Sequence, residues 1–160
     1  MQCFYRNIWL GIVAGFFSVL LSAPLQAQTA ARLEALLNQP ELSWSEAAAF
    51  VLEASETEGY SNGADAFSHA LEQKWLPKKA LSEGPVHLNG IALLLMRSFD
   101  LKGGIFYSLF KNPHHAYREL VYKQVIRGET DPDMIVSGSE LLLMISRLLT
   151  MEEAKEEQQL

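Results

Sequence analysis

Residues 112–149 read NPHHAYRELVYKQVIRGETDPDMIVSGSELLLMISRLL, and their pattern recurs elsewhere in the chain. Asn112 before Pro113 predicts a helix start, because asparagine caps the first turn and proline at the first helical position loses no hydrogen bond. We expect this helix to end at Gly128. Its apolar face follows from the helical spacing of Ala116, Tyr117, Leu120, Val121 and Val125.

A second helix is predicted to begin at about Ser137. Ser137 and Glu140 have the serine-x-x-glutamate spacing of a capping box, in which each side chain accepts a hydrogen bond from the backbone of the other residue. Val136 and Leu141 are placed for the hydrophobic staple that accompanies such a start. Residues 112–149 therefore predict a helix, a loop and a helix.

The same pattern returns at fixed shifts. A shift of 50 lays residues 64–99 on residues 114–149 without gaps, and a shift of 44 lays residues 42–55 on the segment that starts at Val86. The equivalent positions include Leu42 with Val86 and Val136, Trp75 with Val125, and Arg97 with Arg147.

Such self-similarity predicts an all-α fold of stacked tandem helix–loop–helix repeats, two full and one shortened, sharing one core. The repeats are expected at about residues 29–55, 62–99 and 112–149. The first helix of the shortened copy should begin at Thr29, and the capping box should recur at Ser43 and Glu46. In the shared core, we expect four residues of the third copy to pack on Leu71, Leu94 and Leu95 of the second. These four residues are Leu120, Val121, Leu142 and Ile145.

An apolar cluster, IFYSLF at positions 105–110, follows Gly103 and Gly104, which we expect to end the preceding helix. Such a cluster either packs beneath the repeats as a short helix, which we prefer, or forms a contact surface. The charged tail after Leu149 is expected to be a helix end.

The amino terminus predicts export. Arg6 precedes an uncharged apolar run at residues 8–21, and Ala27 offers a small residue at a cleavage position. A run of this length is shorter than the roughly 20 residues that span a bilayer. We therefore expect a signal peptide at residues 1–27, one domain at residues 28–160, no membrane span after cleavage, and a place in the periplasm or cell envelope.

The net charge, the single cysteine and the lack of catalytic motifs limit the classes of function that the sequence predicts. Cleavage removes Arg6 and no acid, which leaves 12 basic and 19 acidic side chains, a net charge of −7 that argues against nucleic acid as a partner. Cys3 leaves with the signal peptide, so no thiol chemistry is expected. No nucleophile motif or phosphate-binding glycine loop is present, and we predict no enzymatic activity and no cofactor.

The histidines do not predict a metal site. His114 and His115 are adjacent on a helix and point about 100° apart, so they are expected to be surface residues of the first turn. His69 and His87 are isolated and are expected to be structural.

The acidic loop at residues 129–140 shares part of the residue spacing of a twelve-residue calcium-binding loop. Positions 1, 3, 5, 9 and 12 would be Glu129, Asp131, Asp133, Ser137 and Glu140, but Met134 stands where glycine makes the sharp turn. We therefore interpret it as a solvated acidic loop and predict no metal site.

Residues 128–140 read G-x-x-D-P-x-x-x-V-S-G-x-E and lead into an apolar helix, a pattern that resembles the S-layer homology repeat. The resemblance implies three copies in an exported protein, held on cell-wall polymers or peptidoglycan, with ligand bound in grooves between repeats. A motif arginine contributes to binding in that family. The corresponding residues here are SWSE from Ser43, HLNG from His87 and SGSE from Ser137, so the arginine is absent from every copy.

The predicted function is a non-enzymatic envelope or periplasmic protein that binds peptidoglycan or another wall polymer. The predicted binding residues are Arg118 and Tyr122 on the first helix of the third copy, with Arg127, Asp131 and Asp133 after it. Arginine and aromatic side chains suit sugar or peptide ligands. The alternative is a protein-interaction subunit that docks on an envelope protein through the apolar cluster at residues 105–110.

Overall fold

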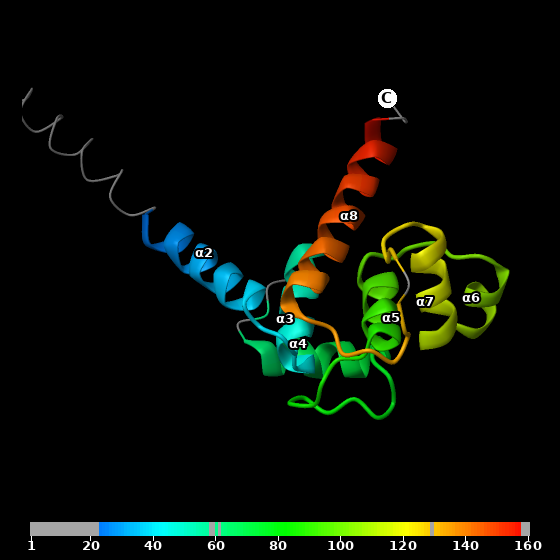
Figure 1. Ribbon diagram of the computed structural model, residues 1–160, viewed down its shortest axis with the longest axis horizontal. Coiled ribbons are helices and arrows are strands. Elements are labelled where there is room, and N and C mark those ends of the chain that lie inside the picture. The colour runs from blue at the N-terminus through cyan, green and yellow to red at the C-terminus, as the bar shows by residue number, and fades with distance from the viewer. Residues whose placement is uncertain (1–22, 58–59, 61, 129, 158–160) are drawn as a thin grey trace, which may run out of the picture. The chain divides into compact units, whose positions relative to one another are not determined.

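The computed structural model describes residues 23–57, 60, 62–128 and 130–157, and confirms the all-α class (Figure 1). Within these ranges no β-strand is present, and two isolated bridges join Ser43 to Pro85 and His87 to Ile135. The helices are α2 (Ala23–Leu37), α3 (Trp44–Ala54), α4 (Gly63–Glu72), α5 (Leu88–Ser98), α6 (Ile105–Phe110), α7 (Pro113–Tyr122) and α8 (Gly138–Glu157).

The chain divides into two compact units, Met1–Leu36 and Leu37–Leu160. Helix α2 begins at Ala23, six residues before the predicted start at Thr29, and it includes the predicted cleavage position at Ala27. The rest of the predicted signal peptide, residues 1–22, lies outside the described residues. None of the described helices is long and apolar enough to cross a membrane.

The helix starts predicted at Ser43, Asn112 and Ser137 are confirmed, because the capping side chains make the expected bonds. Ser43 Oγ accepts from the Glu46 N–H, and the Glu46 carboxylate accepts from the Ser43 N–H at 3.1 Å. Ser137 and Glu140 repeat this exchange, with the Ser137 N–H at 2.8 Å from Glu140 Oε2. Asn112 caps α7, whose first residue is proline.

Two of the predicted helix ends are wrong. Helix α7 ends at Tyr122 and not at Gly128, and α5 ends at Ser98, well before Gly103 and Gly104. Left-handed residues without glycine terminate the helices, which removes the usual sequence signal for a helix end. Residues of this kind follow α3, α4, α5, α6 and α7, namely Glu56 (φ 53°), Lys74 (59°), Asp100 (43°), Lys111 (42°) and Gln124 (61°).

Three residues that precede helices close a ring of backbone hydrogen bonds. The N–H of Leu42 donates to Val136 O at 3.1 Å, that of Val136 to Val86 O at 2.9 Å, and that of Val86 to Leu42 O at 3.0 Å. All three side chains are buried. These are the positions that the fixed shifts align, and the ring brings the starts of α3, α5 and α8 together.

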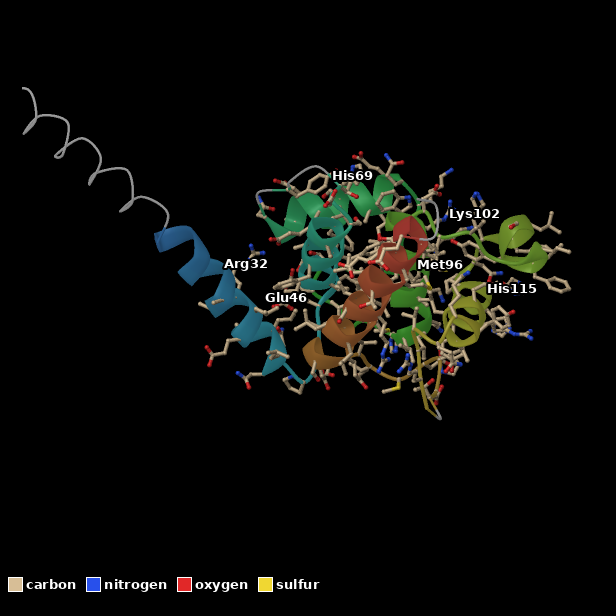
Figure 2. All side chains as sticks on the ribbon, turned by 90° about the horizontal axis from the view of Figure 1, so that it is seen from above. Arg32, Glu46, His69, Met96, Lys102 and His115 are labelled. Carbon is tan, nitrogen blue, oxygen red and sulfur yellow. The ribbon has the colours of Figure 1, made fainter. Side chains whose placement is uncertain are left out.

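Helix α5 is the most buried helix of the second unit, and it packs against α3 and α7. Helix α3 also packs against α4 and α8. Met96 of α5 lies in this interior (Figure 2). Large side chains that are less than 2% exposed include Leu42, Leu52, Ile91, Leu94, Leu95, Met96, Leu120, Leu141 and Leu148.

The burial expected for the shared core is confirmed in part. Leu94, Leu95, Leu120 and Ile145 are buried, whereas Val121 and Leu142 are partly exposed. The prediction is wrong for Leu71, which is 44% exposed. The reason is that the buried side chains of α4 are the alanines at positions 66 and 70, and Leu71 lies beside that face.

The apolar cluster forms the short helix α6, as predicted, but it does not pack beneath the repeats. Four of its residues are exposed, namely Ile105 (83%), Phe106 (67%), Leu109 (71%) and Phe110 (57%). Tyr107 alone is buried, and burial raises the pKa of its phenol; Arg97 lowers that pKa, and Asp100 and Glu119 raise it.

The two glycines before α6 allow close packing. A Cβ at Gly103 would lie 2.5 Å from the Tyr107 ring, and one at Gly104 would lie 2.9 Å from Glu119 Oε1. The Gly104 N–H donates to the same Glu119 oxygen at 2.9 Å. Gly103 therefore leaves room for the Tyr107 ring of α6, and Gly104 ties the start of α6 to α7 through the bond to Glu119.

Candidate functional site

A small groove opens where the first residue of α5 meets the loop after α7 and one side of α8. We call it the α5–α8 groove; its volume is about 140 Å³. Its lining is largely apolar and includes two arginines. The lining residues are Leu88, Ile126, Arg127, Thr130, Met134, Glu140, Leu143, Met144 and Arg147.

Both arginines are tethered to the backbone that follows α7. Arg147 Nη1 donates to Val125 O at 2.7 Å, and Arg127 Nε donates to Gln124 O at 2.9 Å. Because α7 ends at Tyr122, these carbonyls lie beyond the helix and accept side-chain bonds. A guanidinium carries five N–H donors, so one tether orients each group and leaves donors for a ligand.

Glu140 lines the groove but is engaged in the helix cap. Its Oε2 atom accepts from the Ser137 N–H and from the Ser137 hydroxyl, each at 2.8 Å. The carboxylate is therefore directed toward the start of α8, and the arginines remain the groups suited to an anionic ligand.

The equivalent place between α3 and α5 is filled by the protein itself. Under the shifts of 44 and 50, Trp44 corresponds to Leu88, Gly90 to Glu140, and Pro77 to Arg127. A Cβ at Gly90 would lie 2.7 Å from Cη2 of Trp44 and 3.0 Å from Cγ of Pro77. The indole thus occupies the space that leucine leaves open at the α5–α8 groove.

The indole also explains the sequence HLNG. A glutamate at position 90 would need the volume that Trp44 occupies, and His87 accordingly caps α5 without a side-chain hydrogen bond.

The predicted binding residues do not form one cluster. Arg127 lines the groove, whereas Arg118 and Tyr122 are exposed on α7 and are not among its lining residues. Asp131 Oδ1 accepts from the Asp133 N–H at 2.9 Å.

Asp133 joins the acidic loop to α5. Its Oδ1 atom accepts from Asn89 Nδ2 at 2.8 Å, and its carbonyl lies 2.8 Å from His87 Nδ1. The two aspartates therefore shape the loop beside the groove.

Sequence reasoning missed Arg147 as a groove residue. The alignment of Arg97 with Arg147 was the available signal, but the groove that Arg147 lines is visible only in the folded chain.

The carboxylates of Asp131, Asp133 and Glu140 each accept hydrogen bonds from different neighbouring groups. Glu129, the first position of the calcium comparison, lies outside the described residues. Among the residues that are described, no group of three or more histidine, cysteine, aspartate or glutamate side chains could hold a metal ion.

The isolated histidines have structural contacts, as expected. His69 lies between the rings of Tyr60 and Trp75, with centroid distances of 4.9 and 5.5 Å. His115 is not a simple surface residue, because its ring stacks on Phe106 at 6.0 Å and on Phe110 at 5.6 Å.

Two larger hollows are lined by carboxylates and contain no arginine. One lies at the ends of α3 and α5 beside α8, and its acidic residues are Glu56, Asp100, Glu152 and Glu153. The other lies at the start of α3, with Glu41, Glu46 and Glu83.

Glu46 is held by its neighbours in this second hollow. Partial burial raises its pKa, but the hydrogen bonds from Ser43 and Gln39 together lower the pKa by more than burial raises it. The pKa of Glu46 therefore lies below its usual value. A carboxylate held in its charged form repels an anionic ligand.

Comparison with family models, curated proteins and solved structures found no match to this chain.

Proposed function

We propose that this protein is a non-enzymatic cell-envelope binding module that engages an acidic substituent of a wall polymer, such as peptidoglycan, in the α5–α8 groove. The observation that carries this function is the pair of tethered guanidinium groups of Arg127 and Arg147 over an apolar lining. Arginine suits carboxylates and phosphates, and the leucine and methionine side chains suit the carbon skeleton beside the acid.

The charge of the whole chain makes this groove distinctive. The predicted mature chain carries a net charge of −7, which repels polyanions in general, and both larger hollows are acidic. A local pair of arginines supports selective capture of one anionic group.

The groove volume of about 140 Å³ limits what can enter it. Sites for complete small-molecule ligands have volumes of about 300–1,000 Å³. One branch of a polymer fits this size, with the polymer chain remaining outside, and repeated branches on a polymer raise avidity without further contacts in each groove.

The architecture proposed with this function is a set of tandem helix–loop–helix copies similar to S-layer homology repeats. The hydrogen-bond ring of Leu42, Val86 and Val136 supports it, because equivalent backbone atoms meet in a closed cycle. We propose export to the periplasm or envelope on the evidence of residues 1–27 alone.

A sedimentation assay with purified peptidoglycan and its attached polymers tests the function. Arg127→Ala should weaken retention of the processed protein about ten-fold, the effect of losing roughly 1.4 kcal/mol of a charged hydrogen bond. Arg118→Ala is the matched control, because this arginine is exposed on α7 and does not line the groove. Equal retention of both variants and the unchanged protein would remove the groove as the binding site.

A further inference from the structure

We propose that α6 is a peripheral membrane anchor that inserts its apolar side chains into the headgroup region of an anionic lipid bilayer. Ile105, Phe106, Leu109 and Phe110 are 57–83% exposed on a helix of only six residues. Figures 1 and 2 both show α6 at the edge of the Leu37–Leu160 unit, beyond α7. This surface is separate from the α5–α8 groove and does not depend on the function proposed there.

The support beneath α6 keeps these side chains pointing outward. Tyr107 is buried, and the Gly104 N–H is bonded to Glu119 of α7. The His115 ring stacks on both phenylalanines from the α7 side. A helix fixed in this way cannot turn its exposed residues into the core without losing these contacts.

Charge identifies the occupant of this surface. Residues 101–124 carry four basic side chains and one acid, a net charge of +3, whereas the whole chain carries −6, which leaves −9 for the rest. The basic residues are Lys102, Lys111, Arg118 and Lys123, and the first two are exposed and flank α6. Lys102 and His115 are labelled near α6 in Figure 2.

An anionic bilayer matches both features. Apolar and aromatic side chains enter the boundary between headgroups and acyl chains, and nearby lysines bind anionic headgroups. The strongly negative remainder of the protein is repelled from the same surface, so the molecule approaches with α6 first.

A protein partner or a second copy fits this surface less well. Stable protein interfaces bury about 800 Å² on each partner, which is more than one side of a six-residue helix provides. Two copies would also bring the exposed Lys102 and Lys111 of each chain close to those of the other. Insertion into lipid needs only a few side chains and suits a short helix.

Vesicle flotation tests the anchor. The experiment uses the processed protein, residues 28–160, because the apolar run at residues 8–21 would bind lipid by itself. The protein should float with mixed phosphatidylglycerol–phosphatidylcholine vesicles, and raised salt should weaken that binding. Pure phosphatidylcholine vesicles should retain much less.

Two matched pairs of variants locate the contact. Ile105→Ser with Leu109→Ser should weaken partitioning about ten-fold or more, whereas the exposed pair Leu71→Ser with Leu81→Ser should leave it unchanged. Lys102→Glu with Lys111→Glu should weaken it by at least about ten-fold, and Lys78→Glu with Lys79→Glu should have a much smaller effect. Far-UV circular dichroism should be the same for all four double variants.

A fluorescent reporter gives a second measurement. The indole introduced by Phe106→Trp should shift its emission to the blue when anionic vesicles are added. Absence of vesicle binding, equal binding by the α6 variants and their controls, or capture of an envelope protein through α6 without lipid binding would each overturn the anchor.

Discussion

The indole of Trp44 lies over Gly90 so closely that a Cβ at residue 90 would stand 2.7 Å from Cη2 of the ring. This contact seals the junction between α3 and α5, and the equivalent junction between α5 and α8 is left open by Leu88. One aromatic residue thus separates a packed interface from a candidate binding groove.

Gly90→Ala should destabilise the protein by about 1–3 kcal/mol, the usual cost of forcing an extra carbon into a packed interior. Trp44→Leu in the same chain should relieve most of this cost, so the two substitutions should be strongly non-additive. Denaturant unfolding of the two single variants and the double variant measures the coupling. Additive losses of free energy would show that the indole and Gly90 are not in contact.

Leu120→Ala should lower the free energy of unfolding by about 2–5 kcal/mol, because the side chain is fully buried. A domain of this size has only about 5–15 kcal/mol in total, so the loss is large. Trp75 fluorescence, which reports from the segment after α4, should show the same earlier melting as circular dichroism. Leu109→Ala, at a site 71% exposed, is the control and should change stability by less than about 0.5 kcal/mol.

If Trp75 fluorescence keeps its original midpoint while Leu120→Ala unfolds α7 and α8, the helices of the Leu37–Leu160 unit do not share one cooperative core.

Lys74→Gly should stabilise the protein by about 0.5–1 kcal/mol. Lys74 has φ 59°, and a side chain in this conformation costs about 1–2 kcal/mol, part of which glycine recovers after its larger unfolded-state entropy is deducted. The adjacent Gln73 has φ −72°, so Gln73→Gly should destabilise instead. Thermal melting of the two variants should therefore move in opposite directions.

Acid should weaken the cap of α3. The pKa of Glu46 is lower in the folded protein than its ordinary value of 4.5, so its contribution to stability is complete above about that pH. The contribution is lost as the pH falls through the lower folded value, because protonation removes the acceptor for Ser43 and Gln39. Glu46→Gln should therefore flatten the fall in melting temperature at acidic pH, and Glu41→Gln, at an exposed site, should not.

The capping pair itself should be worth about 1 kcal/mol, measured as the effect of Ser43→Ala at neutral pH. A melting curve with the same acid dependence in Glu46→Gln as in the unchanged protein would contradict the assignment of this carboxylate.

The sequence predicted the starts of α3, α7 and α8 and the aligned positions, because capping residues and repetition leave signals in the sequence. Ser43, Asn112 and Ser137 act through residues three positions away, and the shifts align Leu42, Val86 and Val136 as equivalent positions. These are properties of nearby side chains and of repetition.

The helix ends could not be predicted in the same way, because Lys74 and Gln124 carry no preference for the left-handed conformation that they adopt. The exposure of α6 was equally hidden. Apolar composition alone favours burial, and the outward direction depends on Tyr107 filling the space beside Gly103.

The candidate groove was found in part. Arg127 was predicted from its place after the first helix of the third copy, but the opening of the groove depends on the size difference between Trp44 and Leu88 across two junctions. That comparison requires the position of the indole in the folded protein, and the fixed shifts in the sequence do not give that position.

The ring of Leu42, Val86 and Val136 also sets the order in which the protein can fold. Its longest bond joins Leu42 to Val136, so closure must wait until nearly the whole chain has been synthesised. Contacts between such distant positions slow folding, because the chain loses conformational entropy before the contacts form and lower the free energy. An incomplete chain that stops before Val136 lacks two of the three bonds. A polypeptide built in this way stays incompletely folded while it is being made, and its three helix starts come together only in the last stage of synthesis.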